Sequence, residues 1–158
     1  MAVTHKYNIH SFRQGIDSPA ILLRLYCSLV IIELAIKDKL NFSRSIGHDI
    51  KRGINEILCS RTSPLPINHQ DFLVQQALAD LRTQADKIEN DLNNLWCTRP
   101  NGSISPVDPK KYPDIRYLKH HSDEHSNSSE KTSDEDLQQA LITAEAIIRH
   151  LRTLSILA

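Results

Sequence analysis

The sequence has little of what β-rich, disulfide-bonded or zinc-binding proteins need. Its 158 residues include only 4 glycines and 3 phenylalanines, and β-branched residues rarely alternate with polar ones. The three cysteines, Cys27, Cys59 and Cys97, are an odd number and show no Cys-x-x-Cys spacing. Neither a disulfide framework nor a zinc knuckle is therefore expected. Leucine and isoleucine dominate the apolar residues, which favours helices over sheet.

No charge of either sign prevails, and no apolar run is long enough for a membrane span. Lys and Arg number 19, and Asp and Glu also number 19, so only a local basic patch can attract nucleic acid. Arg24 and Glu33 interrupt the longest apolar run, AILLRLYCSLVIIELAI. The N-terminus MAVTHKYNIHSF is too polar for a signal peptide. We therefore expect a soluble cytoplasmic protein with one domain, residues 1–158.

Four segments repeat apolar residues at three- and four-residue steps, the spacing of amphipathic helices. Helices are predicted over 18–40, after a hinge at Gly47, from about 68 to about 96, and from a Ser133 cap onward. The apolar stripe of the third helix faces either a bundle core or a coiled-coil dimer seam. No strand is predicted. The expected fold is all-α, an antiparallel bundle of four or five helices with a long loop before the last helix.

Residues 98–132 are expected to form that loop. Pro100, Pro106, Pro109 and Pro113 exclude a long helix in its first part. The polar stretch HSDEHSNSSEKTSDED follows, so we expect an extended and partly mobile segment. A loop of this length in a compact domain is usually either functional or disordered.

Four stretches, taken in order, resemble the HEPN superfamily (higher eukaryotes and prokaryotes nucleotide-binding). They are LVIIELAIKDKL, GHDIKRGINEIL, KYPDIRY and SDEDLQQALITAEAIIRHLRTL. The resemblance covers most of residues 18–156. It implies a bundle of four or five helices, often dimeric, that works on nucleotides or RNA. Many members of the family are bacterial toxins or antiviral effectors, and others are non-catalytic modules that bind nucleotides or partner proteins.

Arg116 and His121 have the Arg-x4-His spacing of the family's ribonucleases, where the pair sits at a dimer groove. Cleavage of RNA through the 2′-hydroxyl needs a base, an acid and a cation, which His and Arg supply. The spacing also arises by chance, and Tyr117 stands where catalytic members have a polar residue. In the alternative, Tyr112, Pro113 and Tyr117 pin the loop to the bundle, and Arg116 is a surface or pocket cation.

Two more polar positions are candidates. Glu33 lies on a strongly apolar helix, and it either pairs with Lys37 or faces a polar pocket beside the Arg116 loop. In the second case Glu33, Arg116 and His121 form one constellation. His48 lies at a helix start, where it either caps the helix or lines a pocket whose free amides can hold a phosphate.

No metal and no cofactor is expected. Three imidazoles and two carboxylates gather at His120, His121, Asp123, Glu124 and His125. Their segment has no helical anchor, however, and a metal site needs prearranged geometry.

The sequence leaves two main functions open. The first is a module that binds nucleotides, RNA or a partner protein in a bacterial defence or toxin–antitoxin system, as a homodimer or with a protein partner. The alternative is a metal-independent ribonuclease that uses Arg116 and His121, with Glu33 beside them. A regulatory subunit whose partner carries the chemistry is a third reading. The residues expected to contact the ligand are Arg44, His48, Lys51, Tyr112, Arg116, Tyr117 and Lys119.

Overall fold

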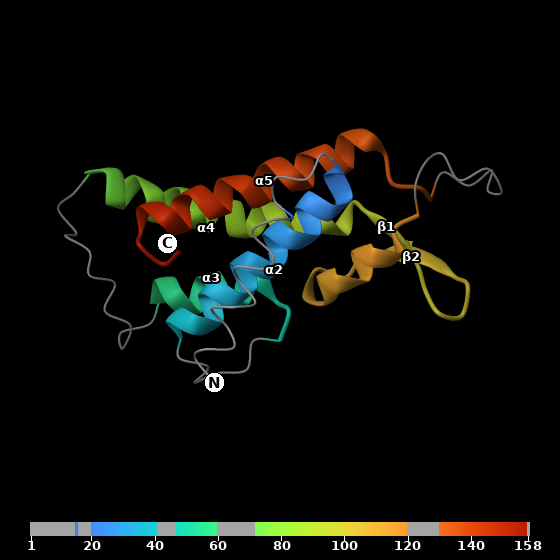
Figure 1. The fold of residues 1–158 in the computed structure, drawn as a ribbon, viewed down its shortest axis with the longest axis horizontal. Coiled ribbons are helices and arrows are strands. Elements are labelled where there is room, and N and C mark those ends of the chain that lie inside the picture. Colours follow the sequence, from blue (N-terminus) through green and yellow to red (C-terminus); the bar gives the residue numbers. More distant parts are fainter. Residues whose placement is uncertain (1–14, 16–19, 41–46, 60–71, 120–129, 158) are drawn as a thin grey trace.

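Four α-helices make up most of the described part of the chain (Figure 1). The structure is a computed structural model that describes residues 15, 20–40, 47–59, 72–119 and 130–157. The helices are α2 (Ile21–Lys39), α3 (Ile50–Cys59), α4 (Phe72–Asn93) and α5 (Asp134–Thr153). The predicted all-α bundle is confirmed. Within the described residues, no helix combines the length and hydropathy that a membrane span requires.

The bundle core is made by the predicted apolar stripes. α4 and α5 lie side by side, α2 packs against α5 and α3, and α3 packs against α4 (Figure 1). Leu29 and Ile36 of α2, Leu81 of α4 and Leu151 of α5 are each fully buried. α3 and α5 of the same chain pack against α4, which agrees with a bundle core, while Phe72 and Leu73 at the start of α4 are exposed.

The helix starts follow from local capping chemistry. The Ser133 side chain accepts a hydrogen bond from the Asp136 amide at 3.1 Å, so the predicted cap of α5 is confirmed. Gly47 precedes α3 with φ +56°, a conformation that favours glycine and makes the predicted hinge.

A β-hairpin follows α4, and the prediction of no strand was wrong. α4 ends at Asn93 rather than near residue 96, and β1 (Trp96–Thr98) pairs antiparallel with β2 (Ile104–Pro106). The turn between them carries Pro100, Asn101 and Gly102. The Gly102 amide donates to the Arg99 carbonyl at 2.9 Å, and Gly102 has φ +83°. Glycine in this conformation closes such hairpins, so the turn decides the structure of this segment.

The long connection before α5 is confirmed, but its described part is not an extended loop. A 3-10 helix, η2 (Pro109–Tyr117), follows the hairpin and buries Tyr112 and Ile115 against the bundle. The Lys119 amide then donates to the Trp96 carbonyl, and the Thr132 amide donates to the Lys119 carbonyl, both at 2.7 Å. The hairpin and η2 therefore form one ordered end of the bundle (Figure 1).

Candidate functional site

Glu33 is a buried carboxylate that ties three elements together. It lies on α2 and is 7% exposed. Its Oε1 lies 2.5 Å from His48 Nδ1, and its Oε2 lies 3.5 Å from Lys37 Nζ. The Tyr112 hydroxyl of η2 donates a hydrogen bond to the same carboxylate. A buried carboxylate needs such partners, because its desolvation is costly.

Each of the two roles predicted for Glu33 is therefore found in part. Glu33 pairs with Lys37, and it also faces the segment after the hairpin. There it meets Tyr112 and not Arg116, since no ion pair joins Glu33 to Arg116 among the described residues. His121 lies outside the described residues. Glu33 and Arg116 do not form the expected constellation.

Tyr112 anchors η2 to the bundle. It is 1% exposed. Its ring centroid lies 5.6 Å from that of His48 in an edge-to-face arrangement and 6.5 Å from that of Tyr26. Burial, followed by the negative charge of Glu33, raises the pKa of Tyr112 well above the ordinary value for tyrosine. The hydroxyl thus stays protonated and remains a donor to Glu33.

This raised pKa predicts a loss of stability in alkali. Above pH of about 10 the unfolded chain releases the Tyr112 proton while the folded chain keeps it, so the unfolded state binds fewer protons. The free energy of unfolding then falls as pH rises, by up to about 1.4 kcal/mol per pH unit from this group. Urea denaturation between pH 9 and 11 should show that the free energy of unfolding falls more steeply with pH for the wild type than for Tyr112→Phe. Equal slopes would contradict the protonated, buried phenol.

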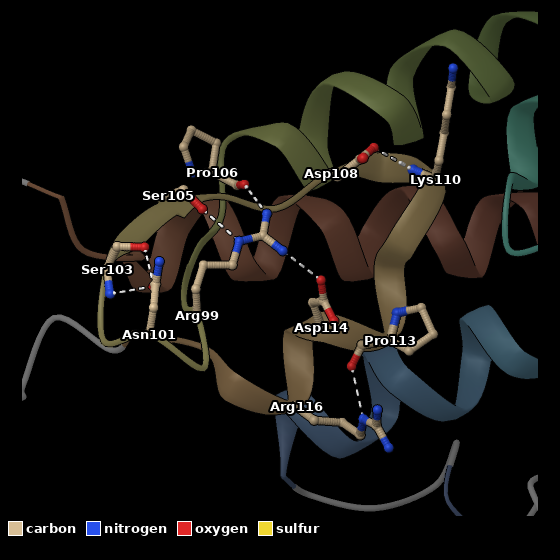
Figure 2. Close-up of polar contacts among 10 residues, drawn as sticks. All are labelled: Arg99, Asn101, Ser103, Ser105, Pro106, Asp108, Lys110, Pro113, Asp114 and Arg116. Carbon is tan, nitrogen blue, oxygen red and sulfur yellow. Dashed lines mark hydrogen bonds and ion pairs between the residues drawn. The ribbon is translucent and has the colours of Figure 1, made fainter.

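Arg116 and Tyr117 form the exposed edge of η2. Arg116 Nε donates to the Pro113 carbonyl at 2.9 Å, and the guanidinium carbon lies 5.5 Å from the centroid of the Tyr117 ring. No carboxylate in the described part of the chain pairs with Arg116. Within the described residues, the other four guanidinium N–H groups make no hydrogen bond, so they are open to an anion. Figure 2 places Arg116 beside α2, on the far side of η2 from the hairpin.

Two surface hollows lie along this edge, and Arg116 lines one while Tyr117 lines the other. The α2 hollow has a volume of about 370 Å3, and the hairpin hollow has a volume of about 490 Å3. Leu23 is 47% exposed in the first, and Tyr117 is 56% exposed in the second. Among the described residues the α2 hollow is lined by Ala20, Leu22, Leu23, Tyr26, Ile115 and Arg116. The hairpin hollow is lined by Thr98, Arg99, Pro100, Tyr117 and Leu118.

Arg99 fastens the hairpin to η2. Its Nη1 donates to Asp114 Oδ2 at 2.7 Å, its Nε donates to Ser105 Oγ at 2.7 Å, and its Nη2 donates to the Pro106 carbonyl at 3.3 Å (Figure 2). The Asp114 carboxylate compensates the charge of Arg99. Although Arg99 lines the hairpin hollow, its guanidinium is already occupied, so its role there is to hold the two segments in place.

Lys51, predicted to contact a ligand, lies elsewhere. Its Nζ pairs with Asp86 Oδ1 at 3.1 Å and with Glu89 Oε1 at 3.4 Å, both on α4. The hydrogen bond to Asp86, followed by the charges of Glu89 and Asp86, raises the pKa of Lys51. Its charge is thus compensated by α4. Lys110 also points away from Arg116, toward α4 (Figure 2). Lys51 and Lys110 are therefore not gathered at Arg116.

The start of α3 is capped by Asp49, not by His48. Asp49 Oδ1 accepts a hydrogen bond from the Arg52 amide at 3.1 Å, and the helix begins at Ile50. A carboxylate at this end makes the helix N-terminus a poor phosphate site. His48 instead uses Nδ1 on Glu33, and its side chain is 51% exposed.

Several predicted residues lie outside the described residues. These are Arg44 and the group His120, His121, Asp123, Glu124 and His125. Lys119 is described and half-buried, and its backbone joins the hairpin to the start of α5. In the described ranges, no group of three or more His, Cys, Asp or Glu residues is arranged to hold a metal ion.

No family model, curated protein or solved structure matches the chain. Sequence reasoning missed Arg99 and Asp114, which hold the hairpin to η2, and Tyr26, which lines the α2 hollow. The turn sequence Pro100-Asn101-Gly102 could have indicated a hairpin here. A hairpin places Arg99 near the segment that becomes η2.

Proposed function

We propose that this chain is a non-catalytic helical module of the HEPN type, which binds nucleotides or single-stranded RNA at Arg116 and Tyr117. The observation that carries the proposal is the Arg116 guanidinium, which lies 5.5 Å from the Tyr117 ring centroid and has no carboxylate partner among the described residues. A guanidinium binds phosphate oxygens with two parallel hydrogen bonds. An exposed tyrosine offers a face on which a base stacks.

The rigidity of this edge supports the proposal. Tyr112 and Ile115 are buried, and the Arg99–Asp114 ion pair ties η2 to the hairpin. Arg116 Nε is fixed on the Pro113 carbonyl. A side chain that is already oriented loses little conformational entropy when a ligand binds, so this arrangement favours binding.

The distribution of charge favours a short ligand over a long duplex. The chain has no net charge. Lys51 is compensated by α4, and Lys110 points away from Arg116. A long duplex is bound through many phosphate contacts along an extended basic face. A ligand recognised by stacking and one or two phosphates needs no such face.

The proposed setting is the bacterial cytoplasm, in a defence or toxin–antitoxin system, with the module acting as a homodimer or with a protein partner. The support for this setting is the resemblance of the four motifs to the HEPN superfamily. Co-purification from a bacterial host and size-exclusion chromatography with light scattering test the assembly.

The binding proposal is tested by fluorescence anisotropy with a labelled single-stranded RNA of eight nucleotides. The Arg116→Ala variant is expected to bind about tenfold more weakly than the wild type or worse, because charge-assisted hydrogen bonds contribute about 1.5–3 kcal/mol. Lys110→Ala is the matched control, since it removes one positive charge from the same helix, and its affinity should stay within about twofold of the wild type. Equal losses in the two variants would indicate unspecific attraction and contradict the proposed site.

The ribonuclease alternative is supported by the same uncompensated Arg116, because cleavage needs a cation near the phosphorus. Wild type, Arg116→Ala and His121→Ala are compared for RNA cleavage in chelator-treated buffer and for growth arrest on expression. Our proposal expects intact RNA and normal growth in all three. Cleavage by the wild type that is lost in both variants would replace the binding module by the ribonuclease.

A further inference from the structure

We infer that the ligand of the Arg116–Tyr117 edge is a dinucleotide unit, two bases joined by a single phosphodiester. The phosphate lies on Arg116, one base fills the α2 hollow, and the other base stacks on Tyr117 in the hairpin hollow. This inference rests on the proposed function and names the chemical class of its ligand.

The α2 hollow has the chemistry of a base site. Four of its six described lining residues are apolar side chains, and Tyr26 adds an aromatic ring. Arg116 is the one charged residue among them. Leu23 is 47% exposed at the rim, so a base that covers it removes apolar surface from water, which is favourable. At about 370 Å3 the hollow falls in the size range of small-molecule sites. An aromatic ring fits this apolar lining, whereas a phosphate needs Arg116 as its partner.

The hairpin hollow is suited to a second uncharged ring. Tyr117 is 56% exposed and provides the stacking face. Arg99 also lines this hollow, but Asp114, Ser105 and the Pro106 carbonyl already take its donors. The compensated Arg99 offers no second anion site. A base therefore fits this hollow better than a phosphate does.

Consecutive residues of η2 line the two hollows, and this placement favours a connected ligand. Ile115 and Arg116 line the α2 hollow, and the next residues, Tyr117 and Leu118, line the hairpin hollow. The guanidinium carbon of Arg116 lies 5.5 Å from the centroid of the Tyr117 ring, so a ligand with one base in each hollow places its connecting phosphate at Arg116. With one uncompensated guanidinium at the crossing, the connection carries one phosphate rather than a pyrophosphate.

The inference is tested by isothermal titration calorimetry with the wild type and four probes. These are AMP, the RNA dinucleotide ApA, its deoxy counterpart and NAD, which has two ring systems joined by a pyrophosphate. Either ApA or its deoxy counterpart should bind about tenfold more tightly than AMP, because the second base adds a stacking contact. The dinucleotide that shows this gain identifies the nucleic acid. NAD should bind no more tightly than AMP.

Two variants assign the bases to the hollows. Leu23→Ser and Tyr117→Ala should each reduce the affinity for the dinucleotide to about the affinity of the wild type for AMP. Lys110→Ala should leave it unchanged. Circular dichroism melts confirm that each variant is folded, which is expected because both replaced side chains are exposed.

Three negative results distinguish failure of this inference from failure of the proposed function. If the eight-nucleotide RNA binds through Arg116 but neither dinucleotide exceeds AMP, the two-base footprint is overturned and the proposed function stands. If NAD equals the better dinucleotide, the single-phosphate part is overturned. If neither the RNA nor any of the four probes binds, the proposed function and the inference fall together.

Discussion

Replacing Tyr112 with alanine is expected to lower the free energy of unfolding by about 3–5 kcal/mol, the usual cost of removing a buried aromatic side chain. Tyr112 is the largest fully buried side chain of η2, at 1% exposure, and it touches the rings of His48 and Tyr26. Its removal leaves a cavity and takes one donor from Glu33. Urea denaturation followed by circular dichroism measures the change.

Tyr117 provides the matched control for this experiment. It is the same residue type in the same 3-10 helix, but it is 56% exposed. Tyr117→Ala should therefore change the free energy of unfolding by no more than about 0.5 kcal/mol. If both variants lost the same amount, Tyr112 would not be the anchor of η2.

The second large effect is expected for Glu33→Ala, which should lower the free energy of unfolding by about 2–4 kcal/mol. The variant leaves the buried Tyr112 hydroxyl without its acceptor and removes the partner of His48 and Lys37. Glu89→Ala is the control, because Glu89 pairs with Lys51 near the surface and that pair contributes less than about 1 kcal/mol.

A double-mutant cycle separates the contact between Glu33 and Tyr112 from the general cost of each change. The variants are Glu33→Ala, Tyr112→Phe and their combination. Residues in direct contact show an interaction free energy of about 0.5–3 kcal/mol. We expect a value in this range, whereas additive losses would mean that the two side chains act independently.

The helices could be predicted from the sequence because their apolar residues recur at helical spacing, around much of α2 and along one stripe of α4. Leu81 and Leu92 recur at helical spacing in α4 and are both buried in the core. The Ser133 cap was predicted because capping is local in sequence. Helical periodicity and capping depend on residues close in the chain, so the sequence was sufficient for them.

The hairpin was not predicted, because its strands are three residues each and too short to show alternation. Its structure comes from the turn at Gly102 and from the Arg99–Asp114 pair, which joins residues of two separate elements. Long-range pairing of this kind leaves no periodic trace in the sequence.

The sequence singled out several polar residues of this region but not their arrangement. Glu33, His48 and Tyr112 were each candidates, and the structure brings them together from α2, the turn before α3, and η2. Lys51 was expected to contact a ligand with them. It faces the acidic side chains of α4 instead, because helix packing decides which way a surface lysine turns.

The central claim is that the edge formed by η2, with Arg116 and Tyr117, is where the ligand binds. The most direct test is a titration of the isotopically labelled protein with ApA or a short single-stranded RNA, followed by amide chemical shifts. We predict that the largest changes fall at residues 115–118, 22–26 and 98–99, and that Arg116→Ala needs about tenfold more ligand, or more still, to reach the same changes. Changes confined to the exposed face of α4 or α5, or none at all at saturating ligand, would contradict the account.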